Sequence, residues 1–94
     1  MGTKETPKFF NGDVDAMAAL TRVNHHTEAY ILGAKILGLP TLVTKLEHVK
    51  CLQDLEGHLP KGLSDYRQTL YDGLIEQARA QLSAEDFAAF YGAL

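Results

Sequence analysis

The sequence AKILGLPT, residues 34–41, decides the fold because it ends one amphipathic helix and begins the next within a few residues. Gly38 suits the left-handed conformation found after many helix ends, and Leu39 supplies the apolar contact that accompanies it. Pro40 cannot continue a helix. The segment GHLP, residues 57–60, repeats this arrangement one helix later. Helices joined by such short turns lie antiparallel beside each other, so the two segments predict a helical bundle.

Upstream of Gly38, apolar and small side chains recur at spacings of three and four, which predicts one helix over residues 13–38. Asp13 is a suitable N-cap for it. A helix of about 25 residues is about 37 Å long at 1.5 Å per residue. The following helices are shorter, so we expect the C-terminal helix or a second copy of the chain to cover the rest of its apolar stripe.

Three further helices are predicted, over residues 42–57, 65–82 and 84–92, with Thr41, Ser64 and Ser83 as N-caps. The helix over 42–57 has an apolar stripe that comprises Leu42, Leu46, Val49, Leu52 and Leu55.

The clearest helix N-terminus in the sequence is at Ser83. Asp86 occupies the reciprocal capping position, and Leu82 can contact Phe87 in a hydrophobic staple. Gly73 lies inside the helix over 65–82, where glycine is unfavourable, so we expect a close packing contact there.

Alternating apolar and polar runs typical of strands are absent from the sequence. We therefore expect an all-α fold, a small three- to four-helix bundle formed by residues 13–94 as one domain, after an N-terminal tail of residues 1–12.

The composition narrows the class of protein. The chain has 94 residues, a net charge of −3 and one cysteine, so it is not a disulfide-stapled miniprotein. Its apolar stretches fall short of the roughly 20 residues that cross a bilayer. The acidic balance and the carboxylates Asp65, Asp72 and Glu76 on one helix disfavour nucleic-acid binding. No segment has the residue order of a signal peptide. We expect a cytoplasmic protein with neither a membrane nor a nucleic-acid partner.

Two pairs have the spacing that metal ligands on a helix require, namely His25 with Glu28, and His48 with Cys51. Neither reproduces a zinc or di-iron signature. The usual alternative for Cys51 is a small core residue.

Helix geometry limits a metal site within one chain. If the first two helices are antiparallel about Pro40, a residue at 40 − n lies level with one near 40 + n. His26 is then level with Asp54, and His48 with Leu32. The two histidine groups are offset by about 6 Å along the axis, too far for one compact four-ligand site. A site shared between two copies stays open.

Several residues are candidates for an interface or a ligand. Ala29 and Gly33 form a step of small residues, a pattern more typical of a close crossing within the chain than of a dimer seam. Lys35, Lys45, Lys50 and Lys61 could meet a small anion or an acidic partner, although such lysines usually solvate a helix face. The candidates of the interface or ligand set are His26, Tyr30, Gly33, Phe9, Phe10, Phe90 and Tyr91.

Catalytic motifs are missing: the sequence has no glycine-rich phosphate loop, no G-x-S-x-G elbow and no H-E-x-x-H. We expect neither catalytic residues nor a cofactor. The first hypothesis is a small non-enzymatic helical interaction or regulatory module, a homodimer that binds a further protein. The alternative is a bundle that binds a metal or a small ligand through His25, His26, His48 and Cys51.

Overall fold

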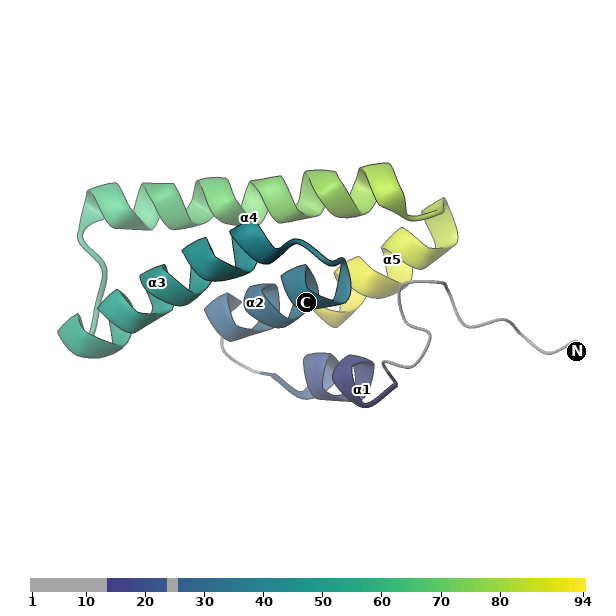
Figure 1. Cartoon of the computed structure of the whole chain (residues 1–94), viewed down its shortest axis with the longest axis horizontal. Helices are drawn as coiled ribbons and strands as arrows, with labels where there is room; N and C mark the ends of the chain where they lie inside the picture. The colour runs from purple at the N-terminus through teal and green to yellow at the C-terminus, as the bar shows by residue number, and fades with distance from the viewer. Residues whose placement is uncertain (1–13, 24–25) are drawn as a thin grey trace, which may run out of the picture.

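The computed structural model describes residues 14–23 and 26–94, with side chains from Ala18 onward. These residues form helices joined by short turns, with no strand in the two described ranges (Figure 1). The all-α bundle is therefore confirmed. Asp13, His25, Phe9, Phe10 and the rest of the predicted tail lie outside the described residues. The helices are α1 (Val14–Arg22), α2 (His26–Ile36), α3 (Pro40–Glu56), α4 (Lys61–Gln81) and α5 (Ala84–Ala93).

The prediction of one helix over residues 13–38 is wrong, because α1 ends at Arg22 and α2 begins at His26. The amide of Val23 donates to the carbonyl of Leu20 at 3.3 Å, which closes α1 with a tight last turn. The run Val-Asn-His-His over residues 23–26 consists of residues with low helix propensity. Among the described residues the longest helix is α4, at 21 residues, so the argument that a second copy covers an overlong first helix no longer applies.

Both glycine-proline turns form as expected. Gly38 and Gly57 have φ angles of 72° and 78°, the left-handed conformation in which a side chain would be strained. The amide of Leu39 donates to the carbonyl of Ala34 at 2.9 Å, and the amide of Gly57 donates to that of Gln53 at 2.8 Å. These bonds satisfy carbonyls at the ends of α2 and α3 and reverse the chain after each helix.

Two of the predicted helix starts need correction. Helix α3 begins at Pro40 and α4 at Lys61, so Thr41 and Ser64 lie inside their helices and cap nothing. Pro40 is the first residue of α3, where its φ angle already suits the helix, and Pro60 is the N-cap residue of α4; neither helix has a side-chain cap. The third start is confirmed, because the Ser83 hydroxyl accepts a hydrogen bond from the Asp86 amide at 3.1 Å.

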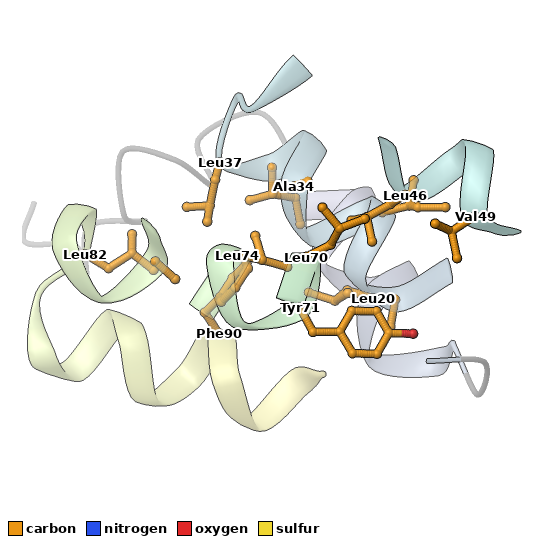
Figure 2. Close-up of a cluster of buried hydrophobic side chains, with 14 residues drawn as sticks. Leu20, Ala34, Leu37, Leu46, Val49, Leu70, Tyr71, Leu74, Leu82 and Phe90 are labelled. Carbon is orange, nitrogen blue, oxygen red and sulfur yellow. The ribbon is translucent and has the colours of Figure 1, made fainter. Parts of the chain in front are cut away.

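The core lies where α2, α3 and α4 meet, with α5 folded back against α4 (Figure 1). Apolar side chains from each of the helices that the structure describes converge there (Figure 2). Gly33 brings α2 and α5 together, since a Cβ atom at this position would lie 3.0 Å from Cζ of Phe90. Gly73 has no such role: it is exposed, and a Cβ atom there would meet nothing within 4 Å. The largest fully buried side chains are Phe90, Leu20, Leu46, Leu74 and Val49.

No helix within the described part of the chain is both long and apolar enough to span a membrane.

Candidate functional site

Helices α2 and α3 are paired in the predicted antiparallel register. Lys50 Nζ lies 3.5 Å from Glu28 Oε2, and Lys35 Nζ lies 4.0 Å from Glu47 Oε2. These pairs follow the rule that a residue at 40 − n lies level with one near 40 + n. In this register, charged, polar and apolar side chains of α2 and α3 line two neighbouring depressions.

The first depression, which we call the apolar groove, runs between α2 and α3 and has a volume of about 720 Å³. Leu55, in its lining, is the most exposed of the large hydrophobic residues that the structure describes, with 75% of its surface accessible. Burying one such leucine gains about 1.5–3 kcal/mol, so its exposure carries a real free-energy cost. The apolar lining is formed by Val23, Ile31, Leu32, Cys51 and Leu55, and the charged rim by Glu28, Lys35, Glu47, Lys50 and Asp54.

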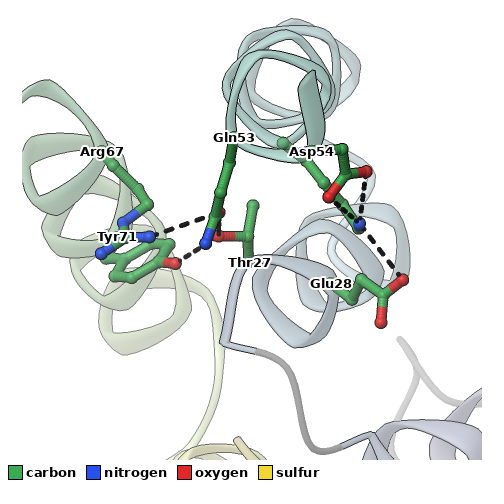
Figure 3. Close-up of polar contacts among 7 residues, drawn as sticks. Thr27, Glu28, Gln53, Asp54, Arg67 and Tyr71 are labelled. Atoms are coloured by element: carbon green, nitrogen blue, oxygen red, sulfur yellow. Dashed lines mark hydrogen bonds and ion pairs between the residues drawn. The ribbon is translucent and has the colours of Figure 1, made fainter. Parts of the chain in front are cut away.

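The second depression, which we call the polar cleft, has a volume of about 410 Å³ and lies where the start of α2 meets α3 and α4 (Figure 3). It shares Glu28, Lys50 and Asp54 with the apolar groove, so these three residues form a wall between the two. Its lining consists of His26, Thr27, Glu28, Lys50, Gln53, Asp54 and Arg67.

A buried polar network supports the polar cleft. The hydroxyl of Thr27, a buried residue, lies 2.7 Å from the Tyr71 hydroxyl and also donates to Gln53 Oε1 at 3.4 Å. Tyr71 stacks on Tyr30, with ring centroids 3.8 Å apart. Burial, together with the nearby charges of ionised Tyr91 and Tyr71 and of Asp72, raises the pKa of Tyr30. The network therefore favours neutral tyrosines and fixes the relative positions of α2, α3 and α4.

The charges around the cleft are separated. Lys50 Nζ donates to Asp54 Oδ2 at 2.9 Å and lies 3.5 Å from Glu28 Oε2, so one ammonium pairs with two carboxylates. The hydrogen bond to Asp54 raises the pKa of Lys50 above its usual value. Arg67, on α4, forms no ion pair with any residue that the structure describes. Its guanidinium instead lies over the Tyr71 ring at 5.6 Å and donates to Gln53 Oε1 at 3.4 Å.

The lysines that the sequence suggested for a basic patch are mostly paired with carboxylates. Lys35, Lys50 and Lys61 each form an ion pair in the structure. The described part of the chain therefore presents no cluster of unpaired lysines.

The interface candidates fall into different environments. Phe90 and Gly33 are buried against each other, so neither is accessible to a partner in this structure. Tyr30 is half-buried in its stack with Tyr71. Tyr91 has 55% of its surface accessible and stacks on Phe87 with centroids 5.6 Å apart. His26 is exposed at the edge of the polar cleft.

The metal candidates that the structure describes do not assemble into a centre. His48 and Cys51 are both exposed, and the described ranges contain no group of three histidine, cysteine or carboxylate side chains placed to hold a metal ion. His25 lies outside those ranges. Cys51 was expected in the core, and this is corrected: at 3.6 residues per turn it lies about 140° around α3 from the buried Leu46.

Sequence reasoning missed the two residues that define the depressions. Leu55 was assigned to the apolar stripe of its helix, yet it lies about 180° around α3 from Leu46, which the helical period could have revealed. Arg67 gave no local signal, because its importance depends on α4 meeting Gln53 of α3.

Comparison with known proteins identifies no relative from which a function could be inferred: no family model matches the chain, no curated protein matches it and no solved structure matches it.

Proposed function

We propose that this chain is a small non-enzymatic helical interaction module that forms a homodimer, with α3 of a second copy seated against the apolar groove. The observation that carries the proposal is the exposed Leu55 beside a recess that contains Leu32 and Cys51. Exposed apolar surface rimmed by polar residues marks many protein–protein interaction sites.

A second copy fits this surface because the surface is self-complementary. A two-fold interface uses the same patch on both subunits, so that patch needs both a protrusion and a recess. Leu55 provides the protrusion, and the groove between Leu32 and Cys51 provides the recess. In the dimer each Leu55 enters the groove of the other copy and is removed from water.

Charge favours an antiparallel pairing of the two α3 helices. The α3 residues of the groove run from 47 to 55, with Cys51 at the centre. An antiparallel arrangement about Cys51 sets His48, and not a like charge, level with Asp54 of the second copy. A parallel arrangement would set Lys50 against Lys50 and Asp54 against Asp54, and like charges in an interface are costly.

Dimerisation would present two copies of the surface formed by Tyr91 and Phe87, to which we assign the contact with a further protein. Aromatic side chains are enriched in such contacts. The exposed thiol of Cys51 suits a reducing compartment, so we place the module in the cytoplasm.

Sedimentation velocity over a range of concentrations tests the homodimer. We expect the wild-type chain to move from monomer to dimer as concentration rises. Leu55→Glu should remain monomeric at every concentration while keeping its helical circular dichroism spectrum, because a buried carboxylate without a partner opposes association.

Tyr91→Glu is the matched control, because it places the same charge on an exposed apolar residue outside the groove. This variant should dimerise like the wild type. A wild-type monomer throughout the range would refute the homodimer. A Leu55→Glu dimer, or loss of the dimer only in Tyr91→Glu, would place the interface elsewhere.

A further inference from the structure

Arg67 lines the polar cleft but not the apolar groove, so this residue lies outside the proposed dimer interface. We propose that this cleft binds a small zwitterion with the ammonium and carboxylate groups of an α-amino acid. The carboxylate would bind Arg67, and the ammonium would bind the carboxylates of Asp54 and Glu28.

The first argument is the separation of charge across the cleft. On the α4 side, Arg67 forms no ion pair within the described residues, so one positive charge is uncompensated. On the opposite side, Lys50 is shared between Asp54 and Glu28, which leaves one net negative charge. Figure 3 shows Gln53 and Thr27 lying between these two ends. A ligand with one charge of each sign matches this arrangement, whereas a simple anion would be repelled by one end.

The second argument is that Arg67 is held in position. Its guanidinium lies 5.6 Å from the centroid of the Tyr71 ring and donates to Gln53 Oε1 at 3.4 Å. Arginine has five N–H donors in a planar fork, so these contacts leave donors for a carboxylate, which arginine can bind through two parallel hydrogen bonds. A guanidinium held in place loses less conformational freedom on binding.

The third argument concerns the groups between the two ends. Gln53 Oε1 accepts hydrogen bonds from both Thr27 and Arg67, so its carbonyl is turned toward the protein. The side-chain amide of Gln53 keeps two N–H donors that can reach a ligand carboxylate. Thr27 is buried and hydrogen-bonded to Tyr71, so it helps to hold the Gln53 side chain in position.

Size is consistent with this ligand class. A volume of about 410 Å³ lies at the lower end of the range of small-molecule pockets. It accommodates an amino acid and leaves room for water or a short side chain.

Nuclear magnetic resonance titration of the ¹⁵N-labelled full chain tests the proposal with three probes. Glycine is the minimal zwitterion, and acetate and methylammonium each carry one of its two charged groups. We expect glycine to shift the Thr27 amide and the Gln53 side-chain amide saturably, and to bind about tenfold more tightly than either half. This comparison uses the wild-type chain, so it does not depend on whether a variant folds.

Two variants assign the charged groups. Arg67→Gln should lower the affinity for glycine and for acetate by about tenfold each. Asp54→Asn should lower the affinity for glycine and for methylammonium and leave the affinity for acetate unchanged. Arg79→Gln is the control, since Arg79 lies over Phe87 at 4.7 Å and does not line the cleft.

The proposal is overturned if glycine causes no saturable shift up to about 100 mM, or if acetate binds as tightly as glycine. It is also overturned if Arg67→Gln binds glycine like the wild type. None of these results bears on the homodimer, which is measured by sedimentation and depends on Leu55.

Discussion

Gly33 and Phe90 are matched in shape: a Cβ atom on Gly33 would lie 3.0 Å from the tip of the Phe90 ring, tighter than nine in ten real contacts of this kind. Phe90 is fully buried, so its ring has little room to move away. The absence of a side chain at position 33 therefore sets how closely α2 and α5 can approach.

We predict that Gly33→Ala lowers the free energy of unfolding by about 1 kcal/mol. Overpacking against Phe90 costs about 1–3 kcal/mol, while replacing glycine in a helix recovers up to about 1 kcal/mol. Urea denaturation followed by circular dichroism measures the change.

Gly73→Ala is the matched control for that substitution. A Cβ atom at Gly73 meets nothing within 4 Å, so only the helix propensity changes. This variant should be more stable than the wild type by about 0.5–1 kcal/mol. Equal effects of the two substitutions would show that the contact with Phe90 does not limit the packing of α2 on α5.

The turns of this fold could be predicted from sequence because their causes are local. Gly38 and Gly57 combine a left-handed conformation with a proline that follows, and both residues lie within a few positions of the helix ends that they close. The Ser83 cap is local in the same sense. Such signals depend on neighbours in the chain and need no knowledge of the tertiary structure.

The break between α1 and α2 and the two depressions could not be predicted in the same way. The apolar spacing continues across Val23, so it gave no indication that the helix ends there. The polar cleft exists only because Arg67 of α4 meets Gln53 of α3. The position of Leu55 is an intermediate case, since the helical period reveals its exposure once Leu46 is known to be buried.

The hydrogen bond between Thr27 and Tyr71 should be strongly coupled. Thr27→Val alone leaves the buried Tyr71 hydroxyl without this partner, and we expect a loss of about 1–3 kcal/mol in the free energy of unfolding. The double variant Thr27→Val, Tyr71→Phe removes both polar groups, so it should be less destabilised than the sum of the two single variants. Strict additivity in denaturant unfolding would argue against a net contribution from this bond.

Ser83 should stabilise the start of α5. Its hydroxyl accepts from the Asp86 amide at 3.1 Å, so Ser83→Ala should cost about 1 kcal/mol, and Ser83→Asp should retain most of the stability. Thr41→Ala supplies the contrast, because Thr41 lies inside α3 and caps nothing. Thermal unfolding of the three variants compares them, and equal losses for Ser83→Ala and Thr41→Ala would contradict the assignment of the cap.

Stability should fall at alkaline pH through Tyr30. The folded state raises the pKa of Tyr30 above its ordinary value of 10.0, chiefly through burial. Above that pH the unfolded chain loses this proton first, so the folded state holds more protons and the free energy of unfolding decreases as pH rises. Denaturant unfolding from about pH 8 to about pH 11 should therefore show a steeper decline in the wild type than in Tyr30→Phe. Identical slopes would exclude a contribution from Tyr30.

The pKa of Lys50 is also raised, and its contribution has the same sign. Its hydrogen bond to Asp54 stabilises the charged form, which is lost as the pH rises through the folded-state pKa above 10.5. Because Lys50 titrates in both the wild type and Tyr30→Phe, comparing those two proteins isolates the part due to Tyr30.

Cross-linking at Cys51 tests the antiparallel dimer most directly, because this is the single cysteine of the chain. Pairing about Cys51 brings the two thiols close together, and a disulfide requires Cα atoms within about 7 Å. Mild oxidation at concentrations where the wild type sediments as a dimer should give a disulfide-linked dimer in high yield, and Leu55→Glu should give none. A wild-type dimer that stays uncross-linked under these conditions would contradict the proposed interface.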